Sequence, residues 1–324
     1  MRKIFYTALL SIIPFLVQAQ ELFPIAEPAS NIPKGALGIR FFSETYNEVD
    51  RIRNLFALRI MYGITPRLSV YATPNISNHH NQLLPPEFPV HNTPNIGVTH
   101  PYLFNGADFY AKYRFFSHDA QNSHFRMAVY GEYSILKVAH DEGEPTLLDD
   151  NSGYGAGLIA TYLKNHFALS FTGGIIVPFE YKGAVADEIS GLPSTPATVE
   201  YPKAYTTSLS FGYLLYPTTY ESYHQTSWSV YMEFIGKAYG AVQMQVGNVY
   251  YQLPQYRIST QGNKALQANQ YLEAYPGIQS IIRSDLRMDF SLGFPVISRS
   301  YVHFYPVYNF GIQRYFHFKK RHNS

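Results

Sequence analysis

Apolar and polar residues alternate along most of this chain, from Gly35 to Phe318. About twelve segments of roughly ten residues each carry an apolar side chain at every second position. In one of the clearest, the apolar positions are Phe109, Ala111, Tyr113 and Phe115, and the intervening ones are Asp108, Tyr110, Lys112 and Arg114. Alternation of this length is typical of strands in a transmembrane β-barrel. Because lipid satisfies no backbone hydrogen bond, such a sheet must close on itself.

The connections between these segments alternate in length. Tight turns are expected at residues 65–67, 164–165 and 283–285, and long polar loops at 74–105, 177–203 and 238–269. Both ends of the barrel region then fall on the side of the tight turns, as in outer-membrane barrels. We therefore predict an all-β fold, a closed antiparallel up-and-down transmembrane β-barrel of about 12 strands over residues 35–318. It has long extracellular loops and short periplasmic turns. A secreted β-sandwich or soluble barrel, the alternative, has strands nearer five or six residues.

Two residues fit this pattern poorly. Pro276 falls inside a predicted strand, although a closed barrel has no free edge that tolerates proline. The strand is therefore expected to begin at Gly277 or to carry a bulge. Arg314 is in phase with the outward-facing Ile312 and Phe316. A bulge, or a side chain that snorkels to the interface, would accommodate it.

The N-terminus has the features of a secretory signal peptide over residues 1–19. Arg2 and Lys3 precede an apolar run that ends in the cleavage motif Val17-Gln18-Ala19. An N-terminal membrane anchor is disfavoured, because the run is shorter than the roughly 20 residues of a spanning helix. Residues 20–34 are interpreted as a periplasmic lead-in segment and residues 319–324 as a basic C-terminal tail. The chain thus forms one barrel domain, expected in the outer membrane of a Gram-negative type of cell.

Composition agrees with a lipid-facing barrel. Aromatic residues make up 16% of the chain and charged residues only 15%, against about 25% charged residues in soluble domains. The formal net charge is +2, which gives no basic excess for nucleic acid. The chain has no cysteine, and this excludes disulfides and thiolate chemistry. The expected partners are outer-membrane lipid and a small-molecule solute, while the oligomeric state is left open.

Several short runs carry a resemblance to a known family. They are the run from Tyr62 to Val70 (YGITPRLSV), Gly106-Ala107-Asp108, and Lys112-Tyr113-Arg114. In these runs the chain resembles the outer-membrane β-barrel family labelled MetA-pathway of phenol degradation, whose members are described as transporters. The resemblance covers most of the chain after the signal peptide and implies a barrel that passes small solutes, hydrophobic or aromatic compounds among them. It brings no catalytic residues.

Charged residues at the inward positions are the candidate pore-lining residues. They are Arg40, Arg59, Asp108, Lys112, Arg114, Arg126, Glu132, Glu233, Arg287 and Asp289. In one interpretation they solvate the interior or pair across strands. In the other, the barrel encloses a narrow pore, because twelve strands lie between the filled eight-stranded and the open sixteen-stranded barrels. Cationic side chains without nearby acids would then give a weak preference for anions.

A second group of candidates is the histidines of the loop at 74–105. His79, His80, His91 and His100 are suited to binding Zn²⁺ or Cu²⁺, but their spacing matches no fixed ligand motif. A solvated polar loop is the other interpretation.

An enzymatic function has little support in the sequence. Outer-membrane lipases use a serine and a histidine, and the nearest match in this chain is the weak set Ser298, Ser300 and His303. No GxSxG motif accompanies it. We expect no enzyme and no cofactor. The predicted function is an outer-membrane channel for passive passage of small solutes. The alternative is a structural or adhesive barrel with a filled lumen, whose extracellular loops bind a partner or capture metal.

Overall fold

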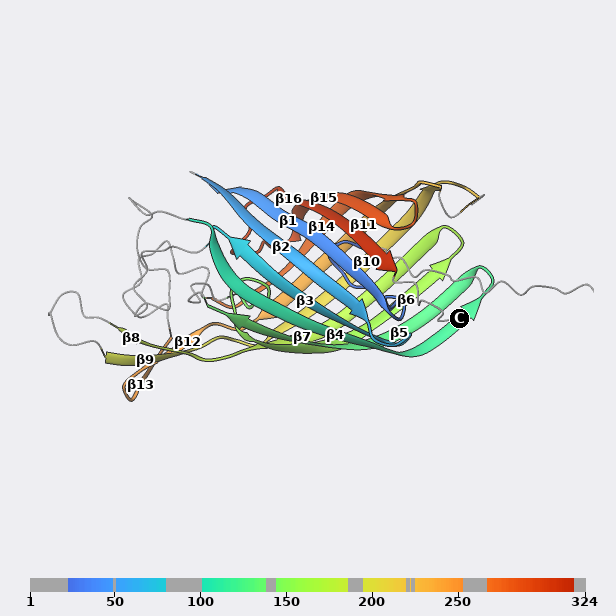
Figure 1. Ribbon diagram of the computed structural model, residues 1–324. Helices are drawn as coiled ribbons and strands as arrows, with labels where there is room; N and C mark the ends of the chain where they lie inside the picture. Colours follow the sequence, from blue (N-terminus) through green and yellow to red (C-terminus); the bar gives the residue numbers. More distant parts are fainter. Residues whose placement is uncertain are drawn as a thin grey trace, which may run out of the picture.

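Twelve antiparallel strands form a closed barrel, as the alternating pattern predicted (Figure 1). The computed structural model describes residues 23–48, 51–79, 101–137, 144–185, 195–219, 222, 225–252 and 267–317. Each barrel strand pairs with the barrel strands that come before and after it in the sequence, and β1 closes the barrel by pairing with β16. The barrel strands are β1 (Ala36–Glu48), β2 (Arg51–Gly63), β3 (Leu68–Ser77), β4 (Leu103–Ala120), β5 (Ser123–Leu136), β6 (Gly153–Lys164), β7 (Phe167–Pro178), β10 (Ala204–Tyr216), β11 (Ser227–Tyr239), β14 (Asn269–Ile282), β15 (Leu286–Ile297) and β16 (Val307–His317).

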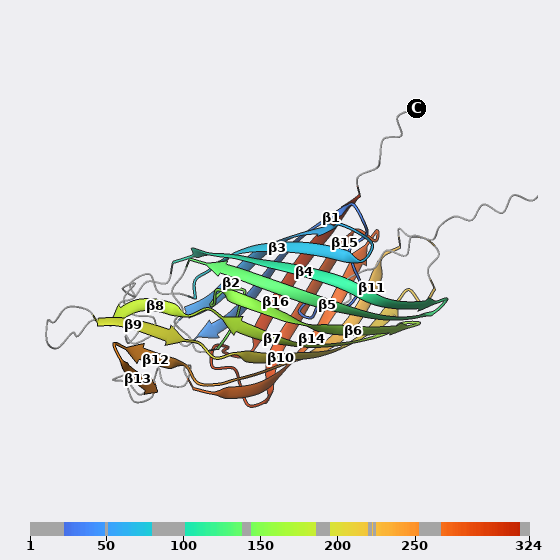
Figure 2. The same cartoon turned by 90° about the horizontal axis from the view of Figure 1, so that it is seen from below.

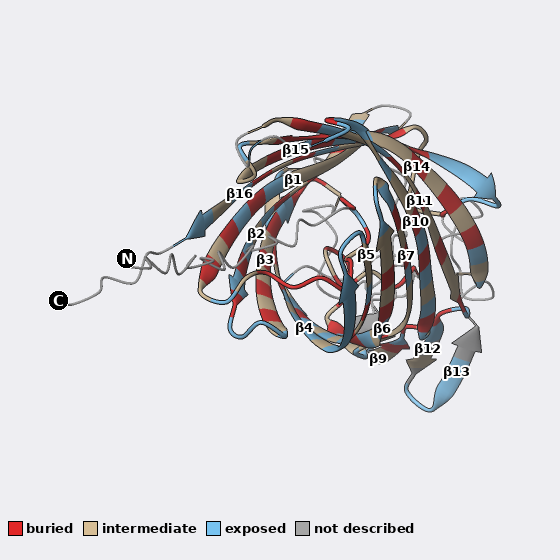
Figure 3. Cartoon of the chain, turned by 90° about the vertical axis from the view of Figure 1, so that its right-hand side faces the viewer, coloured by how far each residue is buried: buried red, intermediate tan, exposed pale blue. Residues whose placement is uncertain are grey.

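The outer wall of the barrel is apolar. On β2, Leu58, Ile60 and Tyr62 are exposed, whereas Ala57 and Met61 at alternate positions are buried against the interior. The same alternation colours the strands of Figure 3 in stripes. A wall of exposed aliphatic and aromatic side chains suits hydrocarbon rather than water. Among the described residues, no helix has the length and hydropathy needed to cross a membrane.

Three local features adjust the wall. Pro276 lies inside β14, so the strand does not begin at Gly277; a register shift follows Leu272, on the β15 side. Arg314 remains outward, with its Nη2 3.7 Å from Asp285 Oδ2 in the adjoining turn. This is the polar contact at the strand end that snorkelling requires. Gly106 has a φ of 149°, which favours glycine, and marks a register shift between β3 and β4.

A second, smaller sheet was missed by the sequence prediction. The connections at 177–203 and 238–269, predicted as polar loops, contain four further strands in the order β13-β12-β9-β8. These are β8 (Tyr181–Val185), β9 (Thr195–Glu200), β12 (Gln243–Val246) and β13 (Val249–Gln252). The sheet projects from the end of the barrel opposite the short turns (Figures 1 and 2). Because β9 pairs with β12, it joins the two connections.

The N-terminal segment, of which residues 23–34 are described, lies inside the barrel (Figure 3). Phe23, Ala29 and Ile32 are almost completely buried. The segment leaves the lumen beside Gly63, where an added Cβ would lie 2.2 Å from the carbonyl oxygen of Pro33. The sequence pattern carries no sign of these lumen contacts, because the segment has no strand periodicity and its contacts are made by single residues to different strands.

Candidate functional site: the closed lumen

The N-terminal segment is anchored to the barrel by polar contacts. Four of its backbone N–H groups donate to side chains from three strands, β3, β6 and β11. The bonds are Ile25 N to Glu233 Oε1 (3.1 Å), Ala26 N to Glu233 Oε2 (2.7 Å), Ala29 N to Thr161 Oγ1 (2.8 Å) and Ile32 N to Ser69 Oγ (3.1 Å). Because the acceptors lie on separate strands, the segment spans the lumen.

Glu27 is the charged centre of this segment. Its Oε1 accepts a hydrogen bond from Arg59 Nη1 at 2.6 Å, and its Oε2 accepts one from Lys112 Nζ at 3.1 Å. The Lys112 ammonium, which is fully buried, also donates to the carbonyl oxygen of Pro28 at 2.7 Å. One carboxylate thus pairs with two of the cations that the sequence assigned to the pore.

The other predicted pore cations also have partners. The Asp289 carboxylate forms ion pairs with two arginines, with Arg40 Nη2 at 3.2 Å and Arg287 Nε at 3.1 Å. Arg126 binds Asp119 at 3.0 Å and donates to Ser30 of the N-terminal segment at 3.1 Å. Arg114 lies at the rim with the short turns, where its Nη2 donates to the carbonyl oxygen of Pro66 at 3.0 Å. Each of these cations therefore has a polar partner among the described residues, and the anion preference remains a prediction.

Described residues line two adjoining cavities within the barrel. The larger, of about 250 Å³, is lined by Arg40, Phe42, Lys237 and Tyr275 among others. The smaller, of about 220 Å³, is lined by Asp108, Tyr110, Tyr130 and Glu132 among others. Both include Ile25, Arg59 and Ile235, so they adjoin along the N-terminal segment. Five of the ten predicted pore residues line these cavities: Arg40, Arg59, Asp108, Glu132 and Asp289.

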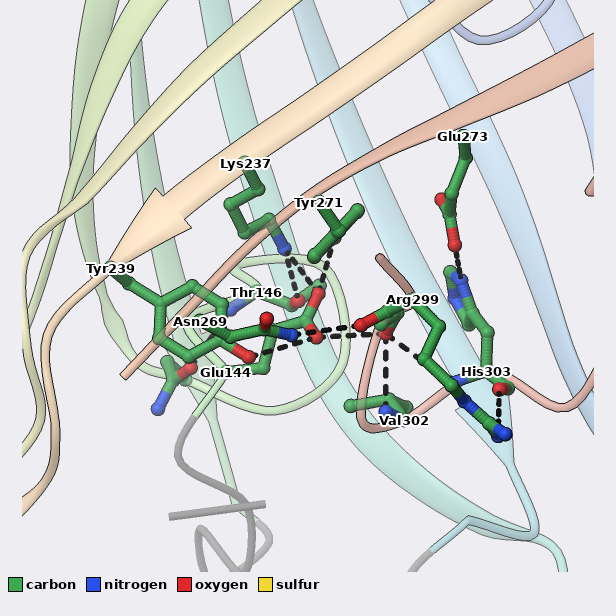
Figure 4. Close-up of polar contacts among 12 residues, drawn as sticks. Glu144, Thr146, Lys237, Tyr239, Asn269, Tyr271, Glu273, Arg299, Val302 and His303 are labelled. Atoms are coloured by element: carbon green, nitrogen blue, oxygen red, sulfur yellow. Dashed lines mark hydrogen bonds and ion pairs between the residues drawn. The ribbon is translucent and has the colours of Figure 1, made fainter. Parts of the chain in front are cut away.

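A second closure lies toward the end with the long loops, and it is centred on Glu144 (Figure 4). The carboxylate accepts hydrogen bonds from Lys237 Nζ at 3.0 Å, Ser300 Oγ at 2.8 Å and Tyr239 OH at 3.3 Å. Tyr271 OH donates to it as well. Burial raises the pKa of Glu144, but the charges of Lys237 and His303 more than offset this, and the pKa is held below its ordinary value. We call Glu144, Ser300 and His303, with the side chains they contact, the outer loop cluster.

His303 is the second charged centre of the outer loop cluster. Its Nδ1 is 2.8 Å from Glu273 Oε1, and its Nε2 is 3.3 Å from Glu44 Oε1. Burial alone would lower the pKa of the imidazole, but the carboxylates of Glu44 and Glu273 raise the pKa of His303 well above its ordinary value. The loop that carries His303 is thus held to β1 and β14 by charge-assisted hydrogen bonds.

The serine and histidine of this loop do not form a nucleophile–base pair. The Ser300 hydroxyl donates to Glu144 and accepts from the backbone N–H groups of Val302 and His303. Both imidazole nitrogens of His303 face carboxylates. Ser298, the third candidate, has a φ of 56° and lies at the end of β15. Within the described residues, these contacts hold the loop of Ser300 and His303 to the barrel, and His303 is not placed to act as the base for Ser300.

Only one of the four candidate metal-binding histidines lies in the described part of the chain. His79 contacts Asp149 through Nδ1, 3.0 Å from Oδ2, and lines the larger cavity. His80, His91 and His100 lie outside the described residues. Within those residues, no three His, Cys, Asp or Glu side chains come together as a metal site. The metal site remains a prediction, and His79 serves here as a contact between two loops.

Comparison with known proteins supports the barrel fold. By sequence, the chain matches no protein-family model and no curated protein, so the family resemblance stays a prediction. By structure, it is similar to the COG4313 outer membrane channel from Pseudomonas putida F1, with 14% identity, a TM-score of 0.54, and 91% of this chain and 100% of that chain covered. The β domain of the Bordetella autotransporter BrkA is 10% identical, with 88% of this chain and 100% of that chain covered and a TM-score of 0.38. The monoaromatic hydrocarbon channel CymD is 12% identical, with 92% of this chain and 95% of that chain covered and a TM-score of 0.33. Likeness at this identity shows the fold alone.

The sequence interpretation missed the acids that close the lumen. Glu27 was placed outside the barrel, and Glu144 lies in a long loop without periodicity. A signal existed for Glu27, because Pro and Ala surround a single charge in a segment that lacks the polar composition of a solvated linker. Glu144 offers no such signal, since its partners Lys237 and Ser300 are distant in sequence.

Proposed function

We propose that this chain is an outer-membrane channel for small solutes, closed at rest by residues 23–34 and opened when this segment shifts within the lumen. The outward apolar wall supports a membrane location. The observation that carries the proposal is the nature of the closure. The segment is anchored by hydrogen bonds and ion pairs to individual strands, and cavities of about 250 and 220 Å³ remain around it.

The segment packs in three small apolar clusters, around Phe23, Ala29 and Ile32, and is anchored between them by polar contacts, which a purely apolar plug would lack. An apolar core gains stability from every contact that excludes water, so it resists local opening. Buried hydrogen bonds to side chains contribute only about 0.5–1.5 kcal/mol each, because water replaces them when the segment leaves. A segment held in this way is able to move without unfolding the barrel wall, whose strands keep their own ladder of hydrogen bonds.

The cavities also support the class of solute. An engineered cavity of about 150 Å³ binds benzene, so both cavities accept molecules of that size. Aromatic rings line them, among them Phe42 and Tyr275 in the larger and Tyr110 and Tyr130 in the smaller. The proposal therefore includes small aromatic compounds among the solutes, in agreement with the family resemblance.

A reversible cross-link tests the gate directly. Ala29 N donates to Thr161 Oγ1 at 2.8 Å, so the two side chains start from neighbouring positions. The chain has no cysteine, and Ala29→Cys with Thr161→Cys therefore introduces the only thiol pair. In planar bilayers, we expect conductance steps from the reduced double variant and none after oxidation, with recovery on reduction. The single variants are the matched controls and should not respond to the oxidant.

Two outcomes would count against the proposal. Equal conductance before and after oxidation, with the cross-link verified by mass spectrometry, would show that solutes bypass the segment. Silence of the wild type and of every reduced variant would favour the alternative, a structural or adhesive barrel with a filled lumen. The closed lumen and the projecting sheet of β8, β9, β12 and β13 are the observations that favour that alternative.

A further inference from the structure

The smaller cavity carries an excess of negative charge. Three carboxylates, Glu27, Asp108 and Glu132, line it against one guanidinium, Arg59. Arg59 is already bound to Glu27, at 2.6 Å, and Glu27 also receives Lys112. The two remaining acids, Asp108 and Glu132, form no ion pair within 4 Å in the described ranges, and the Arg59 charge that attracts both of them is shared with Glu27. A buried carboxylate without a partner is costly, so the site calls for a counter-charge.

Asp108 and Glu132 lie close together on the inner wall. Glu132 on β5 pairs directly with Tyr110 on β4, and Asp108 lies two residues from Tyr110 on the same face. Such diagonal neighbours have Cα atoms about 7–8 Å apart, which allows both carboxylates to contact one small ligand. Asp108 is only 7% exposed, and its Oδ2 has no hydrogen-bond partner.

Hydroxyl groups complete the polar side of this cavity. Thr172, Thr206 and Thr207 line it, and Thr172 Oγ1 is buried without a hydrogen-bond partner. Thr206 is engaged with the Tyr130 hydroxyl. Asp108, Glu132 and Thr172 together offer three free acceptors around one space. A primary ammonium group has three N–H donors and no acceptor, which matches this set.

The remaining lining suits the organic part of such a ligand. The rings of Tyr110 and Tyr130 stack with centroids 5.1 Å apart, and aromatic faces attract organic cations. Ile25 and Ile235 add apolar surface. A bare divalent metal ion is a poorer match, because Ca²⁺ takes six to eight oxygen ligands and Mg²⁺ requires a regular octahedron.

We propose that this cavity binds a small primary ammonium compound, with Asp108 and Glu132 as its counter-charges. Its ammonium group donates to Asp108, Glu132 and Thr172, and its apolar part lies against Tyr110, Tyr130 and Ile235. The binding site stands on these contacts alone; its role in selecting solutes for transport rests on the proposed channel function. In that role it makes the lumen prefer organic cations over anions.

Calorimetry on the full chain in detergent tests the site without any membrane transport. The probes are benzylammonium, neutral benzyl alcohol and anionic benzoate, at low ionic strength and about pH 8, where ordinary carboxyl groups are ionised. We expect benzylammonium to bind at least about tenfold more tightly than benzyl alcohol, since hydrogen bonds between charged groups and their partners are the strong ones. Benzoate should bind more weakly than either.

Isosteric variants assign the effect to the two carboxylates. Asp108→Asn and Glu132→Gln should each weaken benzylammonium binding by about tenfold or more, and weaken benzyl alcohol binding much less. Glu200→Gln is the matched control, because Glu200 is an exposed carboxylate on the projecting sheet. Electrophoretic mobility before and after heating verifies that each variant retains the barrel.

Three results would overturn the inference: no benzylammonium binding to the wild type, equal binding of the three probes, or full binding by the folded Asp108→Asn/Glu132→Gln double variant. These results are separate from the fate of the channel proposal. A barrel that binds benzylammonium but never conducts keeps the site and loses the channel. A barrel that conducts but does not discriminate among the probes keeps the channel and loses the site.

Discussion

The lumen is closed twice, and the two closures are built differently. The N-terminal segment distributes single contacts over several strands, with Glu27 as its one ion-paired centre. The outer loop cluster concentrates its contacts: four donors meet on Glu144, and three groups, His303, Tyr275 and Tyr305, meet on Glu273. Distributed contacts are lost a few at a time, whereas concentrated ones are lost together. We therefore expect the N-terminal segment to open in stages and the outer loop cluster to open as a unit.

The largest effect is expected from Glu144→Ala. The substitution leaves the Lys237 ammonium and several hydroxyl groups buried without their acceptor, and loss of one partner of a buried ion pair costs about 3–5 kcal/mol. Hydrogen exchange should show faster opening of residues 144–152 and 298–306 together. Glu180→Gln, at an exposed site, is the control. Opening of one loop without the other would contradict the expectation that the outer loop cluster opens as a unit.

Glu27→Gln should have the next largest effect. It removes the negative charge that Arg59 and Lys112 share but keeps an amide oxygen for one hydrogen bond, and Glu27 is also less buried than Glu144. We expect a cost of about 2–3 kcal/mol, confined to the N-terminal segment. Exchange of the Ala26 and Ala29 amides should accelerate, and conductance events should become more frequent. Unchanged hydrogen exchange at the Ala26 amide would show that the hydrogen bonds of the segment's backbone N–H groups hold it in place without the Glu27 ion pairs.

Alkaline pH should loosen the outer loop cluster before the N-terminal segment. The pKa of His303 is raised in the folded protein by Glu44 and Glu273, so its stabilisation is fully present below the ordinary histidine value of about 6.5. It declines as pH rises toward the raised pKa, by up to about 1.4 kcal/mol per pH unit. Glu144, whose pKa is lowered, acts in the opposite direction and loses its contribution only in acid.

Limited proteolysis of the long loops between about pH 6 and pH 9 measures this dependence. Cleavage should increase with pH in the wild type and lose most of that dependence in His303→Gln. Tyr46 and Tyr305 also contact the imidazole, so Tyr46→Phe, which keeps the ring, is the matched control. A pH dependence that survives in His303→Gln would assign the titration to another group.

The smallest effects come from one substitution made in each closure. Ser300→Ala removes a hydroxyl that makes three hydrogen bonds, and we expect a cost of about 1–3 kcal/mol. Ser30→Ala removes one bond, from Arg126 Nη1 at 3.1 Å, and should cost about 0.5–1 kcal/mol. Chemical denaturation combined with local hydrogen exchange gives both values. Equal losses of stability for Ser300→Ala and Ser30→Ala would remove the distinction between the concentrated contacts of the outer loop cluster and the distributed contacts of the N-terminal segment.

The barrel wall was predictable because its pattern is local. The alternation of Leu58, Ile60 and Tyr62 with inward residues requires only period two and a lipid-facing side. The lumen was less predictable, because its partners are far apart in sequence: Glu27 meets Lys112, and Glu144 meets Lys237 and Ser300. The inward positions were identified, but an ion pair depends on which segment enters the barrel, and no periodicity encodes that.

The small sheet was missed for a related reason. Its strands are four to six residues long, too short for period two to be distinguished from chance. Its central pairing, between Val199 and Met244, joins two connections that each looked like an unstructured loop in isolation.

That central pairing has a consequence for recognition of the sheet by other molecules. Because β9 and β12 belong to different connections, a ligand that recognises the sheet, such as an antibody or a phage fibre, would meet an epitope assembled from two distant stretches of sequence. Peptides copied from either stretch alone would not reproduce it. A nick between β8 and β9 would leave both strands attached through their backbone hydrogen bonds, and so preserve it.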